Sequence, residues 1–245
     1  MFSAAPGTRD PQSFDHLVAR YDRYAELVGA ELRTWLSFHL PAGRQLAASG
    51  RALDAGCGTG MHTELLAERC NEVLAVDVSV PMLDYASTHR APGNVRYEQR
   101  DLHEVTPGQD GPFDVLLCAY TLHHVPDFVT ALEHLRSLAR PGGTVLLVDV
   151  VDDRRCVPRA WLRREALRGF RDDLIHRRRP LAEAAELLRL SLHPDWLDHQ
   201  ATDHLWPPHE WDTITSAVYP GAAITPLYRA RALAWQAPAP LGHYQ

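Results

Sequence analysis

The residues of this chain best suited to chemistry form a glycine loop at residues 54–60 and a carboxylate at Asp77. The three glycines of the loop stand at every second position, and glycine lets a backbone turn tightly and leave space for a ligand. An apolar run precedes the loop, and a second apolar run ends in Asp77. Strand, glycine loop, helix, strand and acid in this order form a nucleotide-binding unit, in which the acid accepts hydrogen bonds from a ribose diol.

The details of the loop favour one class of nucleotide. A dinucleotide fingerprint reads G-x-G-x-x-G, whereas Met61 occupies the third glycine position here and the extra glycine is Gly60. The loop opens with Asp54, and a carboxylate there suits a cationic amino-acid group better than a pyrophosphate. A ligand that combines an ammonium, a sulfonium and an adenosine therefore fits better than NAD. The loop predicts S-adenosylmethionine as the cofactor.

Further motifs follow the loop in a recognisable order. The set comprises residues 54–60, Asp77, residues 100–102, residues 113–115 with 122–127, and residues 138–143. As a set it resembles the class I S-adenosylmethionine-dependent methyltransferases. The branch that it resembles is the small-molecule one, with the ubiquinone and menaquinone methyltransferases and many tailoring enzymes of natural-product pathways. The resemblance covers roughly residues 14–151, and beyond residue 151 it implies the fold but not the substrate.

The resemblance implies a set of cofactor contacts. Asp54 would bond to the cofactor's ammonium group through water, Asp77 would hold the ribose, and Met82 would pack on the adenine. The complete expected set is Asp54, Gly56, Cys57, Gly58, Gly60, Asp77, Val78, Met82, Asp101, Leu102, Ala119, Tyr120 and Tyr21. At each of these positions the alternative is a structural turn or a helix cap.

The candidate catalytic residues are two histidines and a tyrosine. Methyl transfer from a sulfonium requires the protein to align the acceptor, exclude water and, for some acceptors, remove a proton. His123 and His124 follow a predicted strand near the expected methyl position, and histidine suits proton transfer at neutral pH. In related enzymes the N-terminal helix covers the cofactor, and one of its tyrosines pairs with a histidine at the position of His124. We therefore predict Tyr24 and His124 as a catalytic pair and His123 as a second candidate base; core packing is the alternative for the tyrosine.

A parallel sheet must bring these residues to one edge. Apolar runs predict strands at residues 51–54, 72–77, 95–99, 115–119 and 144–151. Helical periodicity predicts helices at residues 64–70, 81–88 and 128–138, with a turn at 141–143. The alternation predicts an α/β fold, a Rossmann-like doubly wound and mostly parallel sheet, with an antiparallel C-terminal hairpin formed by residues 222–227 and 228–236.

The same pattern divides the single domain expected over residues 1–245 into four parts. They are lid helices at 14–40, the cofactor-binding core at 51–151, a substrate-cover insertion at 152–212 and the hairpin at 222–236. Residues 154–190 are predicted to be helical. Ten arginines against three acids in residues 154–179 favour a solvated helix face or an interface over a binding patch.

Residues 193–211 hold four histidines, three aspartates and three tryptophans. The histidine and aspartate spacings match no common metal motif, and histidines in loops are usually solvated, so no metal is expected. The tryptophans Trp196, Trp206 and Trp211 either wall an aromatic acceptor pocket or anchor an irregular loop to the core. The sequence leaves both interpretations open.

Composition narrows the compartment and the partners. No apolar run approaches the ~18 residues of a membrane span, and the N-terminus lacks the features of a secretion signal. Four cysteines without paired spacing favour reduced thiols in the cytoplasm. The net charge of −6 disfavours a nucleic-acid partner, and the absence of lysine excludes Schiff-base chemistry by a side chain. We expect a small-molecule partner, no nucleic acid and no membrane, and leave a homodimer open.

The sequence therefore predicts a methyltransferase that converts S-adenosylmethionine to S-adenosylhomocysteine. The acceptor would be an O, N or C atom of an aromatic or heteroaromatic metabolite in a bacterial biosynthetic pathway. Three alternatives stay open: a non-methylating enzyme of this fold, such as a cyclase, a non-catalytic binding module, and a macromolecular methyltransferase. The last is disfavoured because residues 118–121 read Cys-Ala-Tyr-Thr instead of the Asn/Asp-Pro-Pro-Tyr typical of many nucleic-acid amino-group methylases.

Overall fold

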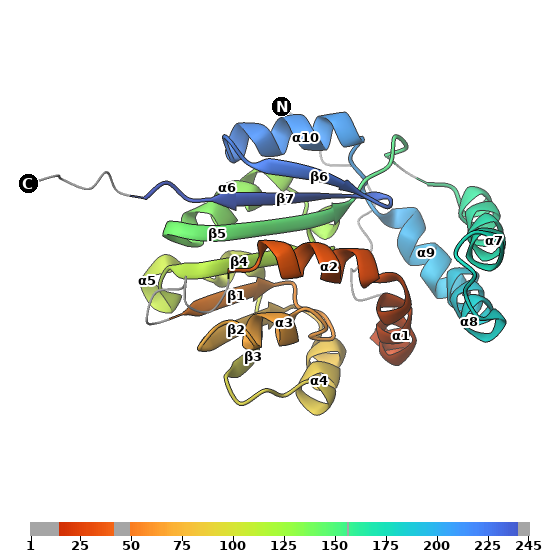
Figure 1. Ribbon diagram of the computed structural model, residues 1–245, viewed down its shortest axis with the longest axis horizontal. Coiled ribbons are helices and arrows are strands. Elements are labelled where there is room, and N and C mark those ends of the chain that lie inside the picture. The colour runs from red at the N-terminus through yellow and green to blue at the C-terminus, as the bar shows by residue number, and fades with distance from the viewer. Residues whose placement is uncertain (1–14, 42–49, 156, 240–245) are drawn as a thin grey trace, which may run out of the picture.

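A computed structural model describes residues 15–41, 50–155 and 157–239. Their strands form one seven-stranded sheet in the order β3-β2-β1-β4-β5-β7-β6 (Figure 1). The strands are β1 (Arg51–Ala55), β2 (Glu72–Asp77), β3 (Val95–Gln99), β4 (Phe113–Ala119), β5 (Ala139–Val150), β6 (Ala223–Leu227) and β7 (Ala230–Gln236). Strands β1 to β5 are parallel, and β7 runs antiparallel to β5 and β6. The predicted Rossmann-like sheet with its antiparallel hairpin is confirmed.

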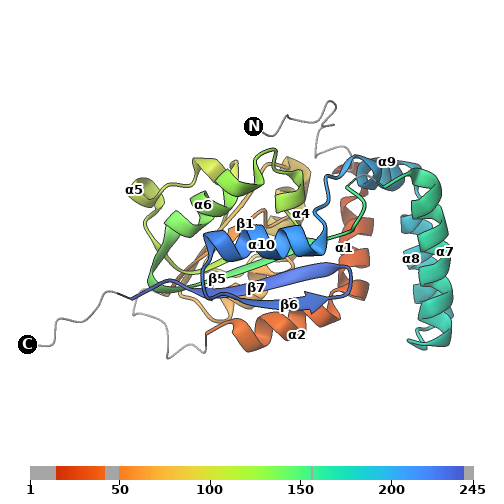
Figure 2. The ribbon, with the colours of Figure 1, turned by 90° about the horizontal axis from the view of Figure 1, so that it is seen from above.

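Helices cover both faces of this sheet. They are α1 (Val18–Val28), α2 (Ala30–His39), α3 (Thr63–Ala67), α4 (Val80–His89), α5 (Pro107–Asp110), α6 (Phe128–Leu138), α7 (Arg159–Ile175), α8 (Leu181–Ser191), α9 (Pro194–Thr202) and α10 (Pro208–Val218). Short 3-10 turns are η1 (Asp15–Leu17), η2 (Leu102–Glu104) and η3 (Leu122–His124). Helices α7, α8 and α9 lie beside α1, at the end of the sheet to which β5 points (Figures 1 and 2).

Two apolar cores explain why the central strands read as unbroken hydrophobic runs. On one face Leu36 of α2 and Leu66 of α3 pack against Val115 of β4. On the other face α6 and α10 pack against the sheet, with Leu132 and Trp211 fully buried. A parallel strand buried on both faces has no solvent side that would require polar residues.

Prolines set the helix starts in the second half of the chain. The region predicted to be helical, residues 154–190, contains two helices: α7 begins after Pro158, and α8 begins after Pro180. The segment predicted as an irregular loop forms α9 and α10, which begin at Pro194 and Pro208. Proline cannot donate a hydrogen bond inside a helix, but its fixed φ suits the first helical position. These prolines start helices rather than a loop.

Two other boundaries differ from the prediction. Helix α3 ends at Ala67, so the helix predicted for 64–70 is shorter and begins one residue earlier. The turn predicted at 141–143 lies inside β5, which begins at Ala139 opposite Phe113. The register then shifts before Thr144 pairs with Val115, so the glycines occupy an irregularity within the strand. The predicted helix residue Phe14 lies outside the described residues.

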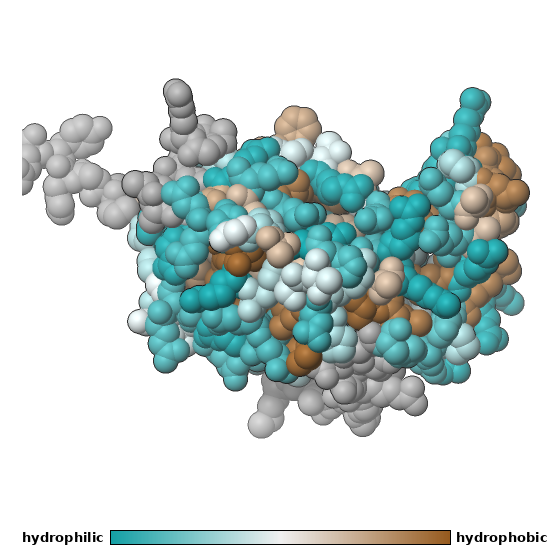
Figure 3. Space-filling view, turned by 90° about the horizontal axis from the view of Figure 1, so that it is seen from below, coloured by the Kyte–Doolittle hydropathy of each residue, from teal (hydrophilic) through white to brown (hydrophobic). Residues whose placement is uncertain are grey.

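The surface is mixed. Figure 3 shows a face that is mainly hydrophilic and carries several separate hydrophobic patches. Some arginines of α7 and of the segment after it pair with nearby acids, as Arg168 does with Glu165 and Arg177 with Asp172. None of the helices described is both long and apolar enough to cross a membrane.

Cys57, Cys70 and Cys118 are buried free thiols, and the fourth cysteine, Cys156, lies outside the described residues.

Candidate functional site

The site begins where the strand order reverses. Strands β1 and β4 are neighbours, but β2 continues the sheet on one side and β5 on the other. In open α/β sheets ligands bind beyond the carboxyl ends of the strands at such a point. The loops after β1 and β4 meet there, because Thr121 Oγ1 donates a hydrogen bond to the Gly56 carbonyl at 3.3 Å. The predicted residues of both loops therefore share one edge of the sheet.

Two glycines of the loop after β1 have different physical roles. Gly56 has a φ of +77°, and a Cβ on it would lie 2.2 Å from Thr121 Oγ1, so the contact between the two loops requires glycine. Gly58 has a φ of +52°, and a Cβ on it would meet no described atom within 4 Å. Gly56 thus serves packing, whereas Gly58 borders open space in which a ligand can approach the backbone.

Asp77 ends β2 beside this loop. Its Oδ2 accepts a hydrogen bond from the Gly58 amide at 2.8 Å, and its Oδ1 accepts one from the Ser79 amide at 2.9 Å. A carboxylate offers about four acceptor sites, so one side chain can accept several hydrogen bonds at once. Burial raises the pKa of Tyr21 on α1 to about 12, and the charge of Asp77 contributes to the increase. Tyr21 of the N-terminal helix is therefore near enough to the predicted ribose acid to feel its charge.

Asp54 lies near the end of β1, just before this loop. Its side chain is buried, and its Oδ2 accepts a hydrogen bond from Thr63 Oγ1 at 2.6 Å. Burial raises the pKa of Asp54 to about 7. Within the described chain, its hydrogen-bond partner is this hydroxyl and no cationic side chain pairs with it. A nearby cation would stabilise the ionised form.

The other predicted cofactor residues divide into two groups. Met82 is buried and packs with Tyr21 and Trp196, next to the N-terminal helix. Asp101 instead caps η2: its Oδ1 accepts from the His103 amide at 2.8 Å, and Glu104 completes a capping box. Asp101 therefore acts as a helix cap, and its contact with the cofactor stays a prediction.

Tyr120 closes β4 in an unusual conformation. Its φ is +56°, a region that bulky residues rarely occupy, and its amide donates to the Val148 carbonyl at 2.7 Å. Such backbone strain persists only where the surrounding structure imposes it, and it concentrates at functional sites. The remaining predicted residues follow or end the parallel strands: Cys57 and Gly60 come after β1, Val78 after β2 and Leu102 after β3, and Ala119 ends β4.

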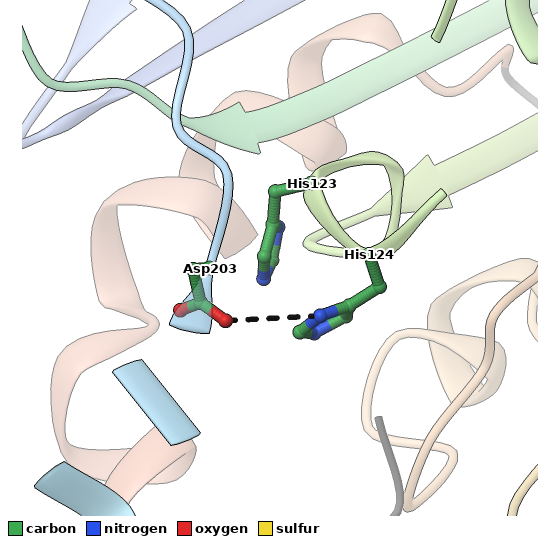
Figure 4. A group of neighbouring side chains, drawn as sticks. All are labelled: His123, His124 and Asp203. Atoms are coloured by element: carbon green, nitrogen blue, oxygen red, sulfur yellow. Dashed lines mark ion pairs between the residues drawn. The ribbon is translucent and has the colours of Figure 1, made fainter. Parts of the chain in front are cut away.

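A group of imidazoles and carboxylates, which we call the imidazole cluster, lies at the carboxyl ends of β4 and β5. Its members are His123, His124, Asp149, His199 and Asp203. His123 Nδ1 lies 2.6 Å from Asp149 Oδ1, and His124 Nδ1 lies 3.8 Å from Asp203 Oδ1. His199 Nε2 lies 3.9 Å from the same Asp203 oxygen. Figure 4 shows both neighbouring histidines directed toward Asp203.

The members of the cluster differ in their proton affinity. Burial lowers the pKa of His123, but the attraction of Asp149 outweighs burial and the net shift is upward. Burial, together with the neighbouring imidazoles, holds the pKa of His124 well below its usual value. Burial lowers the pKa of His199 to about 4 and raises that of Asp203 to about 6. Of the two candidate bases, His123 has the higher proton affinity.

Aromatic side chains connect the cluster to the N-terminal helix. The Trp196 ring lies 5.7 Å from the ring of Tyr24 and 5.6 Å from that of His199. The predicted pair of Tyr24 and His124 is therefore joined through two intervening rings, and no hydrogen bond links these two described side chains. The pairing stays a prediction.

Some predictions for residues 193–211 differ from the structure. His199 was expected to be solvated, yet its side chain is only 6% exposed, whereas His204 and His209 are exposed as expected. Trp211 belongs to the core and does not wall a pocket, whereas Trp196 lies at the site. Asp149 was missed, although a carboxylate inside the apolar run of residues 145–151 was a usable signal.

Comparisons with known proteins converge on one activity. A family model described as "Methyltransferase domain" matches residues 53–147. A ubiquinone biosynthesis O-methyltransferase of Methylococcus capsulatus is 40% identical over 100 residues, which are 40% of this chain and 42% of that protein. The match to the Acinetobacter baylyi counterpart covers 60% of that protein. The chain thus spans only about half the length of these curated relatives.

Longer matches exist as well. An uncharacterized methyltransferase of Mycobacterium tuberculosis is 32% identical over 191 residues, covering 76% of this chain and 86% of that protein. Among solved structures, the DhpI–SAH complex superposes with a TM-score of 0.57 at 24% identity, covering 94% of this chain and 98% of the other. That structural likeness concerns the fold.

Proposed function

The chain belongs to the class I S-adenosylmethionine-dependent methyltransferases, and we propose that it transfers the cofactor's methyl group to a small-molecule acceptor. The observation that carries this proposal is the convergence of Gly58, Asp54 and Asp77 at the β1/β4 edge, where a ligand can approach. S-adenosylhomocysteine is the product of this transfer. The similarity to ubiquinone biosynthesis O-methyltransferases supports an aromatic or heteroaromatic metabolite of a bacterial biosynthetic pathway as the acceptor.

In this proposal the cofactor binds along the loop after β1. The ribose hydroxyls donate to the carboxylate of Asp77, and the ammonium group lies near the buried carboxylate of Asp54, which has no cationic partner among the described residues. The adenine packs against Met82, and Tyr21 covers the ribose from α1. Tyr120, which has a positive φ, directly follows β4 at the same edge of the sheet.

The acceptor then lies between the cofactor and the imidazole cluster. We assign its activation to this cluster, with His123 and His124 closest to the cofactor loops and Tyr24 on the covering helix. Helices α7, α8 and α9 act with α1 as the cover that excludes water from the transfer. The four-part division of the domain made from the sequence belongs to the same proposal.

Calorimetric titration with S-adenosylhomocysteine tests the cofactor site. Asp77→Ala removes two charge-assisted hydrogen bonds, each contributing about 1.5–3 kcal/mol, so the affinity should fall at least about 100-fold. Asp84→Ala, which removes an exposed carboxylate of α4, is the matched control and should bind like the wild type. Equal affinity of the Asp77→Ala variant and the wild type would refute the ribose assignment.

Mass spectrometry of incubations with metabolite extract separates methyl transfer from its closest rival. A product heavier by one methylene, together with S-adenosylhomocysteine, supports the proposal. Consumption of an acceptor without gain of a methyl group would instead support a cofactor-assisted cyclisation. Failure to bind either S-adenosylmethionine or S-adenosylhomocysteine would overturn the cofactor assignment itself and favour a non-catalytic binding module.

A further inference from the structure

The imidazole cluster has the composition of a metal site rather than of a simple acid–base pair. His123, His124 and Asp203 each offer one ligand atom, and these atoms lie within 4.8 Å of one another (Figure 4). Ligands about 2.1 Å from a common ion can be separated by at most about 4.2 Å. Small rotations of the side chains would therefore bring all three atoms into coordination distance.

Asp149 strengthens this interpretation. Metal-binding histidines usually donate their second ring nitrogen to a carboxylate, which fixes the ring and directs the other nitrogen to the metal. His123 has this arrangement, because its Nδ1 is 2.6 Å from Asp149 Oδ1 and its Nε2 remains for a ligand. The pair is almost fully buried, with exposed side-chain fractions of 8% for His123 and 1% for Asp149.

The charge of the cluster also calls for a cation. Among the described residues, the ion-pair partners of Asp149 and Asp203 are imidazoles, and no arginine reaches either carboxylate. The second oxygen of Asp149, Oδ2, is buried without a hydrogen-bond partner in the part of the chain that the structure describes. The cluster therefore holds two nearly buried carboxylates with no arginine beside them, and a divalent ion could take their oxygens as ligands.

We propose that His123, His124 and Asp203 bind one divalent transition-metal ion, with Asp149 as the positioning residue of His123. Imidazole and carboxylate ligands suit Zn²⁺, Mn²⁺, Fe²⁺ or Co²⁺. Three protein ligands leave at least one position open, which is the pattern of catalytic rather than structural metal sites. His199 borders the site, since its ring lies 5.1 Å from that of His124.

The proposed ion gives the methyl transfer a more specific acceptor class, and this step rests on the proposed function. An acceptor hydroxyl bound at the open position would lose its proton to water more readily than in solution. The oxygen then forms a bond to the methyl carbon while the carbon–sulfur bond breaks, and the electron pair stays on sulfur as S-adenosylhomocysteine. The acceptor would be a hydroxylated small molecule.

The metal site can be tested without knowing the acceptor. Protein stripped with a chelator is titrated with Co²⁺ while its visible absorption is recorded, and bound Zn²⁺ is measured after equilibrium dialysis. We expect one ion per chain in the wild type. His124→Ala and Asp203→Asn should each weaken binding at least 10-fold, and Asp149→Asn should weaken it about 10- to 100-fold.

Two controls make the result decisive. His209→Ala removes an exposed histidine outside the cluster and should bind the ion like the wild type. Titration with S-adenosylhomocysteine shows whether each variant retains its fold and its cofactor site. Absence of bound ion in the wild type, or equal affinity in the wild type, His124→Ala and Asp203→Asn proteins, would overturn the metal site. If the wild type does not bind S-adenosylhomocysteine, the proposed function is wrong, whereas the ion titration alone still decides the metal site.

Discussion

The buried ion pair between Asp22 and Arg90 should hold the N-terminal helix on the cofactor core. Arg90 Nη1 lies 2.8 Å from Asp22 Oδ1, and Nη2 lies 3.0 Å from Oδ2. Only 9% of the Arg90 side chain and 5% of the Asp22 side chain are exposed. Arg90 also donates to the carbonyl of Thr59 in the glycine loop at 3.1 Å. The pair thus connects α1, α4 and the cofactor loop.

Asp22→Ala leaves the Arg90 charge buried without its bidentate partner. Breaking a buried pair from one side costs about 3–5 kcal/mol. Glu64 and Glu26 remain 3.3 and 3.7 Å from the guanidinium and are partly exposed, so they compensate in part. We therefore expect a loss near the lower limit, about 3 kcal/mol, which corresponds to a decrease in Tm of about 6–12 °C for a chain of this length.

Urea unfolding followed by circular dichroism measures this loss. Arg23→Ala is the control, because Arg23 is on the same helix and its pairs with Glu26 and Glu186 are exposed; its cost should stay below about 1 kcal/mol. The affinity for S-adenosylhomocysteine should fall in the Asp22→Ala variant and not in the control. A destabilisation of Asp22→Ala by less than about 1 kcal/mol would refute the assignment of the pair as the anchor of α1.

Three further predictions concern the glycine loop and its surroundings. Gly56→Ala should destabilise the protein by about 2 kcal/mol or more in urea unfolding, because residue 56 has a positive φ and the new Cβ would collide with Thr121. The control, Gly169→Ala inside α7, should stabilise the protein by up to about 1 kcal/mol. Asp54→Asn should increase the free energy of unfolding at about pH 8 by about 2 kcal/mol. The pKa of Asp54 is raised in the folded protein, so this group stabilises the fold below its unfolded-state pKa, and the stabilisation is lost as the pH rises through about 7. The same change should weaken S-adenosylmethionine binding in calorimetry, and an unchanged affinity would contradict the role of Asp54 toward the ammonium group. Burial and the charges of Arg33 and Arg90 lower the pKa of His62 to about 4, so the stability contribution of the neutral imidazole should be lost as the pH falls from about 6.5 through about 4, by at most about 3 kcal/mol. Comparison of the unfolding free energy at about pH 7 and about pH 4.5 checks this, and a wild type with the same pH dependence as His62→Gln would exclude His62 as the cause.

The sequence determined the frame of the protein because that frame depends on local patterns. The bounds of β2, β3 and α6 agree with the predicted residues 72–77, 95–99 and 128–138, since each is a continuous apolar or periodic segment between clear breaks. The glycine loop with its following acid is also local, and it indicated the edge of the sheet at which a cofactor would bind. The alternation of strands with helices then predicted a parallel, doubly wound sheet, whereas the order of its strands came from the structure.

Tertiary structure decided what surrounds that edge. Asp203 and His124 come together although they are far apart in the sequence, and nothing in either local segment encodes their distance. The segment with Trp196 and His199 reads as a polar loop, but Pro194 starts a helix that packs against α7 and α8, which buries both side chains. Asp149 gains its partner only because β5 lies next to β4. Contacts of this kind arise from the packing of distant elements, so the sequence identified the cofactor loop, whereas the imidazole cluster emerged only from the fold.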